Sequence, residues 1–175
     1  MFNVKNTDLF YTDPDLIDID TKNFLEESII NFTPESKPGE PDNFYFRQFL
    51  EEDQVLNLTS KLSDLLVKRF HYSSIKLDGV WINKVGTESN QNDILHRDKF
   101  RFSSVTFLND DFKGGDFLYL CPKDQRIKNI KPLKFNTILF EGNAIKHKVD
   151  RVTEGTRYTL ITFWDSPMKE TKSVL

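Results

Sequence analysis

Two histidines and an aspartate are the residues of this chain best suited to hold a metal. His96 and Asp98 stand two positions apart, and His147 follows later in the chain. If the segment around His96 is a β-strand, the His96 and Asp98 side chains lie on one face. A second imidazole beside such a pair completes the two-histidine, one-carboxylate set that binds non-haem Fe(II). A His-x-Asp pair often arises by chance, so its weight depends on the residues that follow His147.

Arg157 and Thr159 come shortly after His147 and share one face of a predicted strand. A guanidinium binds a carboxylate through two parallel, charge-assisted hydrogen bonds, and a neighbouring hydroxyl adds a third. This pair suits the distal carboxylate of 2-oxoglutarate, whose 2-oxo acid end can chelate iron. The alternative is an exposed arginine paired with Glu154 or Asp150. The spacing from His147 and the aromatic strand downstream favour the binding role.

The elements that must position these residues are one helix and many strands. Apolar residues recur every three or four positions at 51–70, which predicts an amphipathic helix. From residue 76 onward, short β-branched and aromatic runs alternate with turn signals. The predicted strands cover residues 76–85, 100–109, 116–120, 134–141, 145–152 and 157–164. Such a series predicts an α+β fold: a double-stranded β-helix, or jelly-roll, barrel with a supporting N-terminal helix.

The 175 residues are predicted to form one domain spanning 1–175. Residues 76–165 are the expected catalytic barrel core. Residues 1–45 form an acidic, proline-containing N-terminal extension, predicted as loops with a short helix or strand near 24–32. Four aspartates in it lack the glycine and closing glutamate of a calcium-binding EF-hand loop, so a solvated surface is favoured. They are Asp13, Asp15, Asp18 and Asp20.

Composition excludes several classes of protein. The net charge of −3 gives no global basic excess, so no nucleic-acid partner is expected. Cys121 is the single cysteine, which rules out an internal disulfide and a cysteine-based metal site. The chain begins without a signal-peptide pattern and contains no apolar run of membrane-spanning length. We therefore expect a cytoplasmic protein without a membrane partner.

Four segments resemble, in order, those of a known superfamily. They are WINKVG, LHRD, SSVTFLNDDFKGGDFLYL and IKPLKFNTILFEGNAIKHKVDRVTEGTRYTLITFW. Together they resemble the Fe(II)/2-oxoglutarate dioxygenases, and specifically the prolyl 4-hydroxylase-like branch, over about residues 76–165. The resemblance implies His96, Asp98 and His147 as catalytic iron ligands. It implies Arg157 as the 2-oxoglutarate anchor, assisted by Thr159.

The sequence departs from the branch at the tyrosines that contact the cosubstrate. Many relatives place a tyrosine on the strand before His-x-Asp, where this chain has Asn-Lys-Val at 83–85. A second tyrosine is replaced by Phe107. Tyr119, on the next predicted strand, is then either a substitute contact or a sheet residue without a ligand.

The resemblance implies oxidative decarboxylation of 2-oxoglutarate to succinate and CO2, coupled to hydroxylation of a C–H bond. The implied cofactors are Fe(II), 2-oxoglutarate and O2, with ascorbate as a further candidate. A prolyl or other peptide residue is the favoured substrate, and a free amino acid or another small molecule remains open. A nucleic-acid demethylase of the superfamily would carry an arginine where Phe163 stands. A non-catalytic jelly-roll binding module is the rival from a different class.

The remaining polar, aromatic and basic residues of note are expected to lie outside the catalytic machinery. Residues 87–93 are polar and are expected to form a mobile lid. His71 and the two tryptophans, Trp81 and Trp164, are expected to be structural or packing residues. The basic side chains around the His-x-Asp pair should point away from the metal, because they alternate with its ligands. They are Arg97, Lys99 and Arg101.

Overall fold

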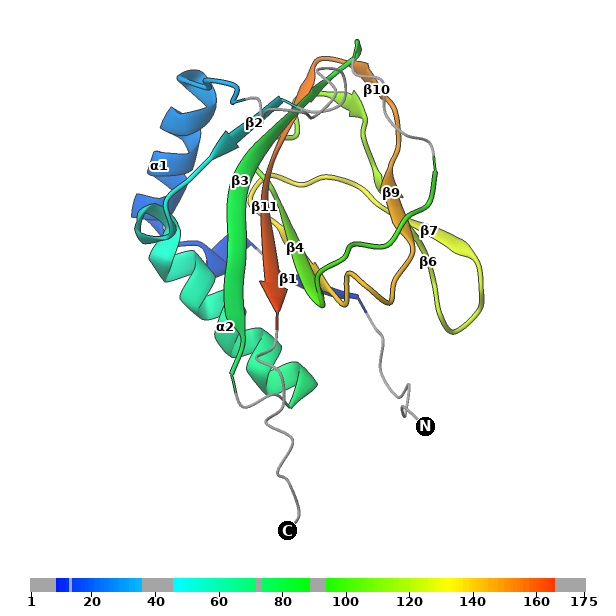
Figure 1. Ribbon diagram of the computed structural model, residues 1–175. Helices are drawn as coiled ribbons and strands as arrows, with labels where there is room; N and C mark the ends of the chain where they lie inside the picture. The colour runs from blue at the N-terminus through cyan, green and yellow to red at the C-terminus, as the bar shows by residue number, and fades with distance from the viewer. Residues whose placement is uncertain (1–8, 13, 36–45, 72–73, 89–93, 166–175) are drawn as a thin grey trace.

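The protein is built on a six-stranded sheet in the order β1-β8-β4-β11-β3-β2 (Figure 1). The computed structural model describes residues 9–12, 14–35, 46–71, 74–88 and 94–165. The six strands are β1 (Phe10–Thr12), β2 (Phe46–Phe49), β3 (Lys76–Gly86), β4 (Phe102–Phe107), β8 (Thr137–Phe140) and β11 (Thr156–Asp165). Each neighbouring pair is antiparallel, as the sequence predicted.

Two smaller antiparallel sheets complete the strands of the described residues. One has the order β7-β6-β9, and the other pairs β10 with β5. The strands are β5 (Lys113–Gly114), β6 (Phe117–Leu120), β7 (Ile127–Ile130), β9 (His147–Val149) and β10 (Val152–Glu154). Figure 1 shows the three-stranded sheet on one side of the large sheet and the helices on the other.

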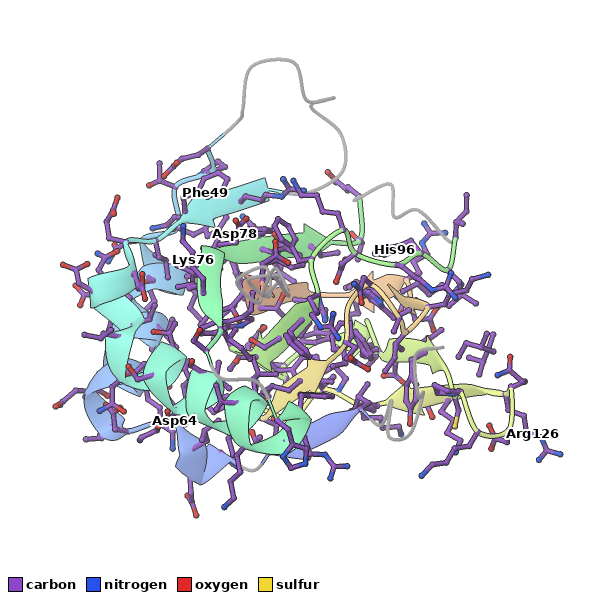
Figure 2. The ribbon with its side chains drawn as sticks, turned by 60° about the horizontal axis from the view of Figure 1, so that its bottom comes forward. Phe49, Asp64, Lys76, Asp78, His96 and Arg126 are labelled. Atoms are coloured by element: carbon purple, nitrogen blue, oxygen red, sulfur yellow. The ribbon has the colours of Figure 1, made fainter. Side chains whose placement is uncertain are left out.

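The helical layer consists of η1 (Pro14–Leu16), α1 (Ile19–Ile30), η2 (Glu52–Val55) and α2 (Leu56–Phe70). The predicted helix at 51–70 is confirmed, although its first turn is a 3₁₀ turn. Asp18 caps α1 by accepting a 2.9 Å hydrogen bond from the Thr21 backbone N–H. His71 ends α2 in the left-handed conformation, with φ 58°. This is a structural role, as expected. Figure 2 shows Asp64 of α2 and His96 on opposite sides of the molecule.

Two apolar cores lie on the two faces of the large sheet. The helix-side core packs α1 and α2 against the sheet, and its buried members include Leu25, Leu58, Leu62, Leu66, Ile82, Phe102, Leu160 and Trp164. The second core lies between the large and three-stranded sheets, and its buried members are Val105, Phe107, Phe117, Ile138, Phe140, Ile145 and Ile161. Strands β4 and β11 contribute to both cores, because successive side chains of a strand point to opposite faces.

Two sequence expectations about strands are wrong. The segment 145–152 is not one strand, because the chain leaves β6 after Val149 and pairs with β5 from Val152 onward. The backbone of Asp150 donates to Asp116 O at 2.8 Å where this change of partner occurs. The segment around His96 is not a strand either, and only an isolated bridge joins it to the sheet. Short edge strands such as β1, β2 and β7 were not predicted.

None of the helices in the described part of the chain is long and apolar enough to cross a membrane.

Candidate active site

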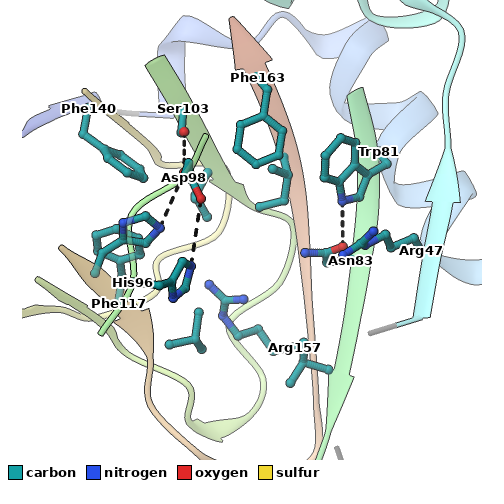
Figure 3. Close-up of a pocket in the computed structure, with 15 residues that line it drawn as sticks. Arg47, Trp81, Asn83, His96, Asp98, Ser103, Phe117, Phe140, Arg157 and Phe163 are labelled. Carbon is teal, nitrogen blue, oxygen red and sulfur yellow. Dashed lines mark hydrogen bonds and ion pairs between the residues drawn. The ribbon is translucent and has the colours of Figure 1, made fainter. Parts of the chain in front are cut away.

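His96, Asp98 and His147 meet in a cavity between the two sheets (Figure 3). One ligand atom from each side chain can be chosen so that all three lie within 4.8 Å of one another. His96 Nε2 is 3.9 Å from Asp98 Oδ1, and His147 Nε2 is 3.6 Å from Asp98 Oδ2. The structure therefore brings together the three residues that the sequence singled out.

Backbone hydrogen bonds to distant segments, rather than a strand at 96–98, place the three side chains of this cluster together. His96 N donates to His147 O at 3.0 Å, and His147 N donates to His96 O at 2.9 Å. This reciprocal pair fixes His96 beside β9. Asp98 N donates to Gly142 O at 2.9 Å, which holds the third residue against the turn that follows β8. The premise of a strand at 96–98 was wrong, yet the two side chains converge because their backbones are tied to neighbouring segments.

The two imidazoles present lone pairs to the aspartate. His147 Nδ1 lies 3.0 Å from Ile145 O, and His96 Nδ1 lies 3.3 Å from Ile94 O. A carbonyl oxygen only accepts, so Nδ1 carries the proton in each neutral ring and Nε2 is free to bind a metal. Burial lowers the pKa of His147, outweighing the nearby Asp98 carboxylate, and so favours the neutral ring. Two nitrogen lone pairs and a carboxylate facing one another fit a divalent metal such as Fe(II).

Ser103 holds the carboxylate of Asp98. Its Oγ donates to Asp98 Oδ2 at 2.5 Å from the cavity-facing side of β4. Gly142 makes room for this contact, since a Cβ there would overlap Ser103 Oγ and lie 2.9 Å from Asp98 Oδ2. Such outer contacts orient metal ligands. Sequence reasoning did not identify Ser103, because a serine in a strand carries no distinguishing signal.

Arg157 is deeply buried, with 2% of its surface exposed, and lines the same cavity. Its Nη1 donates to Thr159 Oγ1 at 3.4 Å, and its guanidinium lies 5.4 Å from the centre of the Phe107 ring. Figure 3 shows the guanidinium turned toward the histidine–aspartate cluster. Val85 is opposite Arg157 in the β3–β11 register. Two apolar side chains, Val85 and Phe107, thus flank Arg157.

The cavity has a volume of about 180 Å³. This is below the roughly 300–1,000 Å³ of pockets for drug-sized ligands, so a small ligand is favoured.

Two tryptophans were expected to be packing residues, and they differ in the structure. Trp81 also lines the cavity. Trp164 is 2% exposed and lies in the helix-side core. Tyr119 packs beside Phe117, with ring centres 6.5 Å apart, and is not among the described lining residues. Its contact with a cosubstrate stays a prediction.

The basic residues around the cluster lie outside the described cavity lining, as expected. Arg97 Nε donates to Ala144 O at 3.1 Å, Lys99 lies over the Phe100 ring, and Arg101 is 3.8 Å from Glu141. The predicted lid at 87–93 lies mostly outside the described residues.

Solved structures with a similar fold include oxygenases. A 2OG-Fe(II) oxygenase family oxidoreductase from Burkholderia pseudomallei has a TM-score of 0.69 at 17% identity, covering 90% of this chain and 84% of that one. A Trichoplax adhaerens prolyl hydroxylase, in complex with a hypoxia inducible factor peptide fragment, has a TM-score of 0.68 at 13% identity, covering 91% and 84%. The 2OG complex of a viral collagen prolyl hydroxylase from Paramecium Bursaria Chlorella virus-1 has a TM-score of 0.63 at 14% identity, covering 91% and 96%.

No family model and no curated protein sequence matches the chain. At these identities the structural likeness defines the fold. The chain has the fold of the 2OG-Fe(II) oxygenases, prolyl hydroxylases among them, and carries in it a His-Asp-His group able to bind a metal ion.

Proposed function

We propose that this protein is an Fe(II)- and 2-oxoglutarate-dependent oxygenase that hydroxylates a C–H bond. One observation carries the proposal: a converging His96, Asp98 and His147 cluster shares a small cavity with the buried guanidinium of Arg157. The cluster supplies the ligands for a divalent metal, and the guanidinium supplies a partner for a carboxylate. The fold of known 2OG-Fe(II) oxygenases supports the same function.

In the proposed reaction, bound iron would supply the oxidising chemistry with O2 and 2-oxoglutarate: one oxygen atom of O2 would enter succinate as CO2 is released, and the other would enter the substrate C–H bond. The two histidines would hold the iron through Nε2 and Asp98 through its carboxylate, and Ser103 keeps that carboxylate in place. Arg157, assisted by the hydroxyl of Thr159, binds the distal carboxylate of 2-oxoglutarate.

We further propose that residues 1–175 form a single cytoplasmic domain with a jelly-roll barrel at 76–165. A prolyl or other peptide residue is the favoured substrate, supported by the peptide complex of the Trichoplax adhaerens structure. Free amino acids and other small molecules are the alternative, and the small cavity volume supports them.

The first test is an anaerobic titration of the metal-free protein with Fe(II) and then 2-oxoglutarate. We expect the weak visible charge-transfer band of an iron–2-oxo acid chelate. Arg157→Ala should require roughly 10- to 150-fold more 2-oxoglutarate, because a hydrogen bond to a charged group contributes about 1.5–3 kcal/mol. Arg151→Ala is the matched control, since Arg151 is exposed and outside the cavity lining.

The titration also identifies the rival function. If iron binds with the affinity of a specific site but no chelate band forms, the oxygenase proposal is wrong. The protein is then better described as a metal-binding module.

A further inference from the structure

Asn83 presents hydrogen-bond donors to the cavity. Trp81 Nε1 donates to Asn83 Oδ1 at 2.8 Å. An indole N–H can only donate, so the amide atom that faces Trp81 must be the oxygen, and Nδ2 faces away from it. Figure 3 shows the amide nitrogen on the side of the histidine–aspartate cluster. Trp81 therefore fixes Asn83 as a donor, and a ligand at this position must supply an acceptor.

Arg47 adds a guanidinium beside this amide. Arg47 and Asn83 are directly opposite in the β2–β3 register, and both line the cavity. The guanidinium lies 5.5 Å from the centre of the Trp81 ring, within the range of a cation–π interaction. Trp81 thus contacts both polar side chains and positions them together. We call these three residues the Arg47–Asn83 wall.

Arg47 is set apart from the Arg157 site, whereas Asn83 is directly opposite Thr159 in the β3–β11 register. Arg157 lies on β11, whereas Arg47 lies on β2, with β3 between them and β2 at the edge of the sheet. Two strand spacings of about 4.8 Å place their backbones roughly 10 Å apart or more. A 2-oxoglutarate molecule that extends from Arg157 to the metal ligands leaves Arg47, and the side of Asn83 next to it, to a second ligand.

The chemistry of the lining favours an anion at the wall. Among the described lining residues the charged side chains are Arg47, Arg157 and Asp98, and Asp98 faces the metal ligands. Arg47 brings a positive charge to the wall, and Asn83 Nδ2 brings N–H donors. A carboxylate offers only acceptors, matches the fork of an arginine and can also accept from Asn83 Nδ2.

We propose that the Arg47–Asn83 wall binds a free carboxylate of the substrate. The inference rests on the proposed oxygenase function and narrows its substrate class. The hydroxylated carbon then belongs to a free amino acid or to the C-terminal residue of a peptide. An internal peptide residue offers only neutral carbonyl acceptors to this wall, so it fits less well than a carboxylate.

The test uses the full chain loaded with Mn(II) and 2-oxoglutarate, titrated in a calorimeter under anaerobic conditions. The probes are the L-amino acids, their N-acetyl derivatives and the primary amide of each. We expect at least one acid to bind, with its amide at least about 10-fold weaker. Free acids and N-acetyl acids separate a free amino acid from a peptide C-terminus. Arg47→Met should weaken acid binding by roughly 10- to 150-fold and leave amide binding unchanged.

Variants of the same strand sharpen the test. Asn83→Asp replaces donors by a negative charge and should abolish acid binding. Trp81→Phe keeps an aromatic ring but removes the indole donor, so it should weaken acid binding less than Arg47→Met does. Lys84→Met is the matched control, because Lys84 faces Phe32 and Tyr158 on the opposite side of β3. Its loss of charge should leave acid binding unchanged.

Three results would overturn the inference: equal binding of acid and amide, binding of no acid, or loss of 2-oxoglutarate affinity rather than acid affinity in Arg47→Met. In each case a normal iron chelate band in the wild type would leave the proposed function standing. If Arg47→Met fails to fold, Arg47→Lys serves instead, because it keeps the charge and loses the bidentate fork. Unchanged acid affinity in Arg47→Lys would then contradict the inference.

Discussion

The two faces of the large sheet use the same strands for different purposes. On the helix side, polar groups between strands bond to one another: Ser104 to Thr162 at 2.5 Å, and Thr106 to Thr137 at 2.8 Å. On the cavity side, Ser103 instead bonds to Asp98, next to the metal ligands. Because side chains alternate along a strand, a residue that stabilises the fold stands next to one that contacts the metal ligands. A substitution on one face should change one property and spare the other.

The largest effect on stability is expected from the helix-side core. Leu62 of α2 is fully buried there, so Leu62→Ala should lower the free energy of unfolding by about 2–5 kcal/mol. Urea denaturation measures the loss. Metal affinity at a temperature where the variant is folded should match the wild type. Leu56→Ala is the control on the same helix, because Leu56 is 52% exposed. A fall in metal affinity in Leu62→Ala would mean that the two faces are coupled.

Ser103 and Ser104 provide a sharper comparison, because they are adjacent on β4 and face opposite sides. Ser103→Ala removes the hydrogen bond to Asp98, so Fe(II) affinity should fall about 10- to 100-fold. Ser104→Ala removes the bond to Thr162, so it should lower stability by about 1 kcal/mol without changing metal affinity. Chelator competition and urea denaturation measure the two quantities. Ser103→Thr should restore metal binding, and equal metal affinities in both alanine variants would refute the separation.

The sequence predicted the parts of the site that depend on residue type. The spacing of two histidines, an aspartate and an arginine, together with the resemblance to a known superfamily, indicated their convergence. The antiparallel strands were predicted where the sequence has long runs rich in β-branched and aromatic residues, as in β3 and β11. The tertiary bridge between His96 and His147 was not predictable, because it depends on hydrogen bonds between distant segments.

Residues of ordinary type could not be assigned from sequence alone. Ser103, Asn83 and Arg47 resemble common strand residues, and only the cavity and its hydrogen bonds distinguish them. Arg47 belongs to a four-residue strand that carries no clear alternation. Trp81 was expected to pack, and it does contact Phe163 at 4.9 Å between ring centres. Its indole N–H gives it a second role that its residue type does not indicate.

The smallest expected effect tests the helical layer alone. Asp18 caps α1, and the hydrogen bond from the Thr21 backbone lowers the pKa of its carboxyl below the usual 3.8. Because the folded-state pKa is lowered, the stabilisation is present above the unfolded pKa and is lost as the pH falls through the folded value. Asp18→Ala should therefore cost about 1 kcal/mol near neutral pH, with a smaller difference in acid. Urea denaturation of the metal-free protein at both pH values measures this. Asparagine caps without titrating, so the stability difference between Asp18→Asn and Asp18→Ala should depend little on pH. Fe(II) affinity at neutral pH should be unchanged in both variants. A cost for Asp18→Ala that persists in acid would show that the cap does not depend on the ionised carboxylate.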